Sequence, residues 1–157
     1  MNIEEKTKEK TCAFYASDYH FEMLSLPYIN KKLEENNEII IMTENDLNET
    51  INTFMSKINL EKTTKEKILN IDWEYNNLKK FKIIKQNSEK GKKTIIFIKG
   101  KENYIKNVNE NIGKWVEKSE NLETIDCYDI NEIGNNLSTI TDKYGKILMT
   151  SGEKNIK

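Results

Sequence analysis

Polar and aromatic side chains follow the first apolar block of the chain, TCAFY at residues 11–15. A nucleotide-binding α/β fold keeps a glycine-rich loop at this address, but neither GxxxxGK[ST] nor GxGxxG is present. Five other residues stand there: Tyr15, Ser17, Asp18, Tyr19 and His20. Aromatic faces beside hydrogen-bonding groups suit a small organic ligand. The competing interpretation makes Tyr15 a core residue, Asp18 a helix N-cap and His20 a surface residue.

A second set of chemical groups lies in ETIDCYDI, where Asp126 and Asp129 flank Cys127 and Tyr128. Strand alternation would put residues 126 and 128 on one side and 127 and 129 on the other. The two acids would suit Mg²⁺ or a general base. No second acidic cluster of suitable spacing accompanies them, so we favour a structural role.

The cysteine and histidine content argues against metal and nucleophile chemistry. Zinc sites draw four ligands from Cys and His, and the chain holds only Cys12, Cys127 and His20. Both cysteines sit in apolar blocks, which indicates small buried side chains rather than a disulfide. A nucleophilic cysteine would need His20 as its activating partner. We therefore expect no cofactor, no metal and no enzymatic activity.

The basic residues argue against nucleic-acid binding. All 25 are lysine and the net charge is -1, so no planar guanidinium is present for bidentate capture of phosphate or guanine. The stretch 79–93 carries seven lysines against one acid, Glu89, and is the best candidate for a polyanion contact. Lysine runs usually form solvated helix faces, so a nucleic-acid partner is disfavoured.

Apolar blocks alternate with helical patterns along the chain. We expect strands at 11–15, 38–43, 93–100, 122–130 and 146–152, and helices at 20–35, 45–58, 101–120 and 130–145. Pro27 should kink the first helix or start a second one there. Between 60 and 92 we favour a short strand at Ile68 to Trp73 followed by a helix, and the alternative is a helix throughout.

This alternation predicts a three-layer α/β domain with a mainly parallel sheet of about five or six strands and helices on both faces. Ligands of such sheets bind outside the carboxyl ends of the strands. Those ends fall at 15–18, 43–45, 99–102, 126–129 and 150–152, with Trp73 as a further candidate. We expect a charged arm at 1–10, one domain at 11–152 and a tail at 153–157. No apolar run spans a bilayer and no secretion signal is visible, so we expect a cytoplasmic protein with no membrane contact.

Four short motifs, in order, resemble the MEDS family, the methanogen and methylotroph sensory domain. They are Cys12 with Tyr15; Gly100, Glu102 and Tyr104; Glu117 with Asn121; and Cys127, Tyr128 and Asp129. The sequence departs from the family where Lys10 replaces a histidine, where KKLEENNE replaces a glycine-bearing turn, and where Lys143 to Gly145 replace a closing His-Pro. The resemblance implies a fold similar to RecA and KaiC ATPases without the phosphate loop. It also implies a role in sensing small molecules, with the matched motif residues at the ligand.

Together these observations predict a non-enzymatic, small-molecule-sensing or signalling domain that passes its signal to a separate protein. The ligand would bind at the carboxyl edge of the sheet through five residues: Tyr15, Asp18, His20, Glu102 and Tyr128. The alternatives are a ligand-free interaction scaffold derived from an ATPase-like fold, a nucleotide-handling enzyme and, through the lysine run, a nucleic-acid-binding protein.

Overall fold

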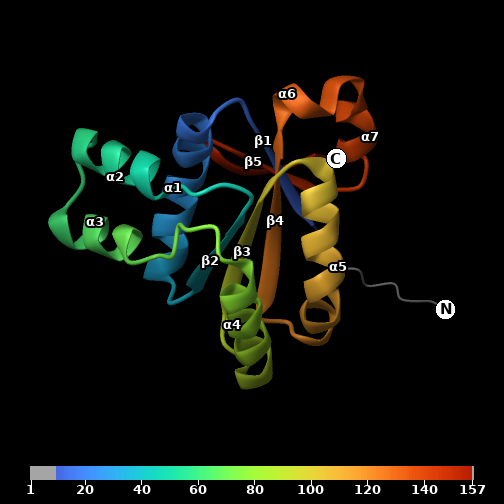
Figure 1. The fold of residues 1–157 in the computed structure, drawn as a ribbon, viewed down its shortest axis with the longest axis horizontal. Coiled ribbons are helices and arrows are strands. Elements are labelled where there is room, and N and C mark those ends of the chain that lie inside the picture. The colour runs from blue at the N-terminus through green and yellow to red at the C-terminus, as the bar shows by residue number, and fades with distance from the viewer. Residues whose placement is uncertain (1–9, 157) are drawn as a thin grey trace.

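Six strands form one sheet in the computed structural model, which describes residues 10–156 (Figure 1). The strand order is β2-β3-β4-β1-β5-β6. All neighbouring strands are parallel except β5 and β6, which are antiparallel. The strands are β1 (Thr11–Tyr15), β2 (Glu38–Thr43), β3 (Thr94–Gly100), β4 (Leu122–Asp129), β5 (Lys146–Met149) and β6 (Gly152–Asn155).

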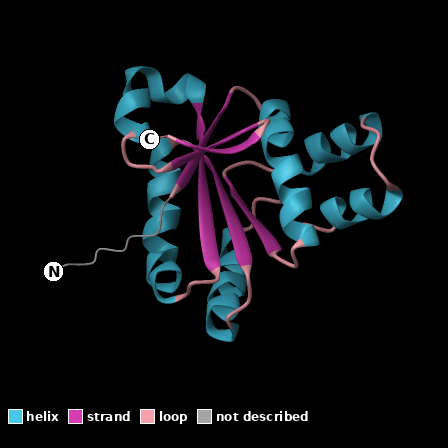
Figure 2. Ribbon diagram, turned by 180° about the vertical axis from the view of Figure 1, so that it is seen from behind, coloured by secondary structure: helices cyan, strands magenta, loops and turns pink. Residues whose placement is uncertain are grey.

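Helices cover both faces of the sheet, which confirms the three-layer α/β prediction (Figures 1 and 2). On one face lie α1 (Asp18–Glu34), α2 (Asn48–Lys57) and α3 (Lys62–Leu69). On the other lie α4 (Asn77–Lys90), α5 (Glu102–Lys118), α6 (Ile130–Ile133) and α7 (Leu137–Thr141), with a 3₁₀ turn at Gly134–Asn136.

The core consists of two apolar layers, one on each side of the sheet. Within β2, Ile41 packs towards α1, while Ile40 and Met42 pack towards α4 and α5. This division follows from the alternation of side chains along a strand. Parallel strands covered by helices on both faces need apolar residues at successive positions, and EIIIMT supplies them.

The segment between β2 and β3 corrects one prediction. Residues 68–73 do not form a strand, and a single helix throughout is also wrong, because α3 ends at Leu69 and α4 begins at Asn77. The indole Nε1 of Trp73 donates to the carbonyl oxygen of Ile68 at 2.8 Å, and both side chains are buried. The apolar residues that resemble a strand therefore anchor a loop in the core.

Three smaller differences concern the ends of elements. Ser17, not Asp18, is the N-cap of α1. Pro27 lies inside α1 and does not start a second helix. The stretch expected as a tail from residue 153 instead contributes to β6, which pairs with β5. The expected arm falls almost entirely outside the described residues.

Lys80 of α4 lies against the outer edge of the sheet. Its side chain is buried, and its Nζ donates to the carbonyl oxygen of Ile41 in edge strand β2 at 2.6 Å. The same Nζ contacts the carbonyl of Glu74 and lies 3.8 Å from Asp72 Oδ1. These contacts tie α4 and the preceding loop to β2.

Among residues 10–156, no helix is both long and apolar enough to span a bilayer.

Candidate functional site

A cleft of about 350 Å³ opens where the carboxyl ends of β1, β2, β3 and β4 meet. The connection that leaves β1 runs through α1 on one face of the sheet, and the connection that leaves β4 runs through α6 and α7 on the other. Adjacent strands with oppositely directed connections leave a crevice that is the usual ligand site of open α/β sheets. Its walls are formed by Tyr15, Ser17, Asp18, Glu44, Asn45, Lys99, Gly100, Lys101 and Asp129.

Lys99 is the buried cation of this cleft. Its Nζ lies 2.9 Å from Asp18 Oδ1 and donates to Asn45 Oδ1 at 3.0 Å. The ammonium also lies 4.6 Å from the centre of the Tyr15 ring and 5.6 Å from that of Phe21. A desolvated ammonium over an aromatic face gains a cation–π attraction. The carboxylate, the amide and the two rings together replace the water that Lys99 loses.

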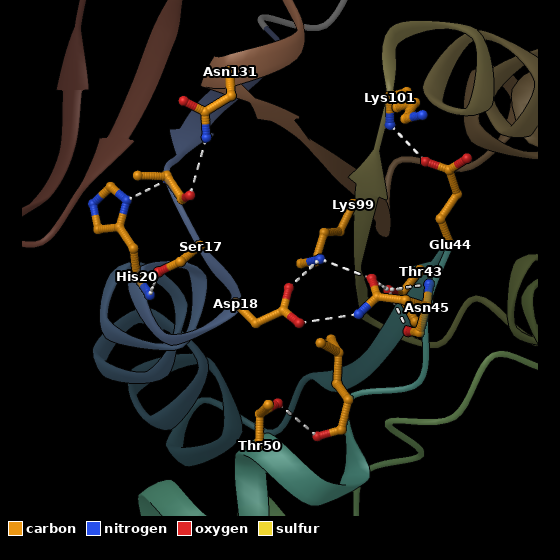
Figure 3. A network of polar contacts seen from close by, with 12 residues as sticks. Ser17, Asp18, His20, Thr43, Glu44, Asn45, Thr50, Lys99, Lys101 and Asn131 are labelled. Carbon is orange, nitrogen blue, oxygen red and sulfur yellow. Dashed lines mark hydrogen bonds and ion pairs between the residues drawn. The ribbon is translucent and has the colours of Figure 1, made fainter.

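Asp18 and Asn45 close a triangle with Lys99, and their side chains point towards one another (Figure 3). Asn45 Nδ2 donates to Asp18 Oδ2 at 3.0 Å. The Thr43 hydroxyl donates to the backbone carbonyl of Asn45 at 2.8 Å and so fixes the loop that follows β2. Each corner of the triangle comes from a different segment: the start of α1, the loop after β2 and strand β3.

Glu44 forms the opposite wall. Its Oε1 accepts the backbone N–H of Lys101 at 2.7 Å, just before α5 (Figure 3). The carboxylate rests against Gly100, where an added Cβ would lie 2.5 Å from Glu44 Oε1 and 2.7 Å from Tyr104 Cδ2. Gly100 is therefore needed for this close approach, and not for wrapping a phosphate.

Side chains hold the turn between β1 and α1, where a nucleotide-binding fold would use glycine. The Ser17 hydroxyl accepts the N–H of His20 at 3.1 Å, and His20 Nδ1 accepts the N–H of Ala16 at 2.8 Å. Asn131 Nδ2 donates to the carbonyl of Ala16 at 3.2 Å (Figure 3). The turn's backbone groups at Ala16 thus bond to His20 and Asn131, which leaves them less open to an anion.

The charges of the cleft are mixed. Three carboxylates, of Asp18, Glu44 and Asp129, face two lysines, Lys99 and Lys101, so the lining carries a formal charge of -1 (2 − 3). Burial raises the pKa of Tyr15, and the nearby carboxylates of Asp129 and Asp18 raise it further, so its phenol stays neutral. Within the described part of the chain, no three His, Cys, Asp or Glu side chains are placed to hold a metal ion.

The structure brings three of the ten predicted site residues into this cleft: Tyr15, Asp18 and Asp129. His20 lies at the turn, where its Nδ1 is already an acceptor. Glu102 is exposed on the first turn of α5 and does not line the cleft. Cys12 and Cys127 are buried on opposite faces of the sheet as free thiols.

Glu117 and Asn121 lie at the amino ends of the strands, opposite the cleft. Glu117 is in the last turn of α5, and Asn121 precedes β4, where its Nδ2 donates to the carbonyl of Gly91 at 2.9 Å. The α5 helix runs from the carboxyl edge back to the amino edge, and the 15 residues from Glu102 to Glu117 span about 22 Å at 1.5 Å each. These two motif residues therefore do not reach a ligand in the cleft.

Tyr128 belongs to a buried network on the α5 face. Its hydroxyl lies 2.6 Å from that of Tyr144, which donates to Asp126 Oδ2 at 2.6 Å. Asn109 Nδ2 donates to Asp126 Oδ1 at 3.1 Å, and Lys10 Nζ lies 3.8 Å from Oδ2. Burial raises the pKa of Asp126, and Lys10 and the two hydrogen bonds oppose that rise. Residues 126 and 128 share one face as alternation predicts, and both hold the core together.

The lysine run is divided by the fold. Lys80 is buried, and the other six lysines of the stretch 79–93 are exposed. Lys92 Nζ lies 2.7 Å from Glu38 Oε1, and Lys93 Nζ donates to the carbonyl of Glu35 at 3.1 Å. Part of the run therefore makes contacts within the protein. The sequence-based prediction that the chain does not bind nucleic acid stays a prediction.

Residues 43–45 and 99–102 lie at the carboxyl edge as the sequence predicts, but neither Lys99 nor the Glu44–Asn45 pair stands out among them in the sequence. A lysine near the end of an otherwise apolar strand, KTIIFIKG, was the available signal, because a cation at a buried strand position needs a partner. No protein-family model, no curated protein and no solved structure matches the chain. The MEDS resemblance therefore stays a prediction from the sequence motifs.

Proposed function

We propose that this chain is a non-enzymatic small-molecule-sensing domain, of the kind that the MEDS resemblance implies, and that it binds a small polar organic ligand in the cleft at the carboxyl edge. The observation that carries the proposal is the triangle that the buried Lys99 forms with Asp18 and Asn45 at the wall of a cleft of about 350 Å³. That volume lies within the range of about 300–1,000 Å³ that small-molecule sites occupy.

The lining favours a ligand rich in hydrogen-bond donors. The carboxylates of Asp18, Glu44 and Asp129 already accept hydrogen bonds within the protein, but each has about four lone-pair sites and can accept more. The ammonium of Lys99 is engaged by Asp18 and Asn45. A polyphosphate would meet a lining of formal charge -1 and a turn with no glycine-rich cradle. A polyol, an amide or an amino compound fits this pattern better than a nucleotide.

The triangle offers a route from ligand to signal. It joins α1 to the loop before α2, so a ligand that donates to Asp18 in place of Asn45 changes how these two segments are held together. A ligand acts as a signal only if it binds two conformations with different affinities. The separate protein that reads the signal would contact the α1 and α2 surface beside the cleft.

A thermal-shift screen with calorimetric follow-up tests the proposal. The library holds polyols, amides, amino compounds, carboxylates and ATP with Mg²⁺, and native mass spectrometry of protein from its own host looks for a retained molecule. We expect at least one donor-rich compound to stabilise the wild-type chain and not Lys99→Met, and ATP to give no binding heat. Failure of every compound, or binding of ATP alone, would refute the proposal.

One observation favours the scaffold alternative. Tyr75, just before α4, and Leu78, in its first turn, are 59% and 79% exposed. Large apolar side chains left exposed are typical of protein contacts where they form a continuous patch. Under this alternative, light scattering shows an assembly that Leu78→Lys dissolves, and none of the library compounds binds.

A further inference from the structure

A second hollow of the molecule is apolar. It is a groove of about 460 Å³ between α1, α2 and α3, and it shares no lining residue with the cleft. Its apolar walls come from Met23, Leu26, Phe54, Ile58 and Leu60. Met23 and Leu60 are 41% and 36% exposed, so the groove opens to solvent. This volume is also typical of a small-molecule site.

Glu22 is the exception among these apolar walls. It lines the groove and is 0% exposed. Neither carboxylate oxygen has a hydrogen-bond partner among residues 10–156. The hydroxyl of Thr50, which influences the pKa of Glu22, donates its one proton to the carbonyl of Leu47 at 3.1 Å. A buried carboxylate without donors is costly to the fold, because it loses hydration and gains no hydrogen bond in exchange.

The charges around Glu22 do not remove this cost. Asp18, one turn earlier on α1, repels a charge on Glu22, and Lys99 of β3 attracts it. Lys99 is itself paired with Asp18 at 2.9 Å. Burial is the main influence, and it raises the pKa of Glu22, while Thr50 and Lys99 oppose the rise only in part. Glu22 thus has unused capacity to accept hydrogen bonds.

We propose that this groove binds a lipophilic primary amine, with the alkyl chain along the apolar walls and the ammonium paired with the carboxylate of Glu22. An ammonium carries three donors and no acceptor, so it matches a carboxylate that lacks donors. A neutral alcohol offers one donor and no charge, and a fatty acid repels Glu22. Glu22 lines the groove and is 0% exposed, so the amine reaches its carboxylate as flexible wall side chains such as Met23 move aside.

Calorimetric titration of the full chain with n-octylamine, n-octanol and octanoate tests the proposal. We expect n-octylamine to bind about tenfold or more tightly than n-octanol, since hydrogen bonds to charged groups are the strong ones, and octanoate to bind least. Because the paired carboxylate must be ionised, n-octylamine binding should strengthen from pH 5 to pH 8, while n-octanol binding stays constant. Alkylamines remain protonated across that range, as lysine does with its pKa of about 10.

Two variants and a control separate the contribution of the Glu22 charge to binding from that of the apolar wall. Glu22→Gln, which removes the charge but not the shape, should bring n-octylamine to the affinity of n-octanol. Leu60→Ser should weaken both compounds, because it trims the apolar wall. Glu34→Gln, at an exposed position of the same helix, should change neither.

Three results would overturn the proposal. One is n-octylamine binding no tighter than n-octanol, and another is unchanged amine binding by Glu22→Gln. The third is light scattering that shows a dimer dissolved by Leu60→Ser, because the groove would then be covered by a second copy of the chain.

Discussion

Removing the charge of Lys99 is the sharpest test of the triangle at the cleft. Lys99→Met keeps the apolar stem over Tyr15 and deletes the ammonium, while Asp18→Asn deletes the carboxylate and keeps the ammonium. The two changes leave different charges behind. The side chain of Lys99 is 3% exposed and that of Asp18 is 35% exposed, so water can solvate a lone Asp18 but not a lone Lys99.

This asymmetry sets the magnitudes. Lys99→Met should lower the free energy of unfolding by about 1–2 kcal/mol, because the lost ion pair and cation–π attraction are partly offset by the removed desolvation cost. Asp18→Asn should cost about 3 kcal/mol, because it strands a buried ammonium. The double variant should cost less than the sum of the two by about 1–2 kcal/mol, the coupling energy of groups in direct contact.

Urea denaturation of the four proteins supplies the double-mutant cycle, in which effects on the helix dipole at Asp18 cancel. Lys101→Met, at an exposed lysine two positions along, is the matched control and should stay within about 0.5 kcal/mol of wild type. The reasoning fails if Asp18→Asn costs no more than Lys99→Met, or if the coupling energy is below about 0.3 kcal/mol, within the additivity error of independent sites.

Three further predictions concern other parts of the fold. Burial raises the pKa of Glu22 above its ordinary 4.5. Between these two pKa values the native state keeps a proton that the unfolded chain has lost. The contribution of Glu22 to stability therefore falls as the pH rises from 4.5 through the native pKa. Glu22→Gln should therefore be more stable than wild type at pH 8 and lose that advantage at pH 4 in urea titrations. An equal difference at both pH values would contradict this. Gly100→Ala should cost about 1–3 kcal/mol in thermal or urea unfolding, because the new methyl meets Glu44 Oε1 at 2.5 Å. Gly113→Ala is its control, since a Cβ there meets nothing within 4 Å and alanine favours the helix by up to about 1 kcal/mol. A Gly100→Ala protein as stable as wild type would show that the Glu44 side chain moves away at no cost. Tyr144→Phe should lower the free energy of unfolding by about 1–3 kcal/mol, because Asp126 loses the donor at 2.6 Å. Tyr19→Phe, at a 56% exposed position, is its control. A loss no larger than that of the control would show that the network does not stabilise the fold.

The strands and the cleft's location followed from the sequence because they depend on local pattern and chain topology. β-branched runs such as EIIIMT and TIIFIKG have few conformations other than a buried strand. Alternation with helices then fixes parallel pairing and brings the carboxyl ends together. The strand β6 was missed because GEKN is short and polar, and only its pairing with β5 makes it a strand.

The chemistry within the cleft was harder to predict, since it depends on packing between distant segments. Lys99 resembles a surface lysine until the fold places Asp18 and Asn45, 81 and 54 positions away, on either side of it. Glu117 and Asn121 were assigned to the ligand by a sequence motif, and a motif does not say at which end of the sheet its residues lie. The path of α5 shows that a residue at its end lies at the opposite edge from a residue at its start.

The position of Lys80 bears on how the protein avoids self-association into fibrils. A run such as EIIIMT stacks readily into cross-β assemblies when its backbone is free, and here it forms one lateral margin of the sheet. Lys80 takes the carbonyl of Ile41 from that margin, and the other margin is the four-residue β6, which carries Glu153 and Lys154. A lysine contact on one side and a short charged strand on the other are devices that discourage edge-to-edge growth.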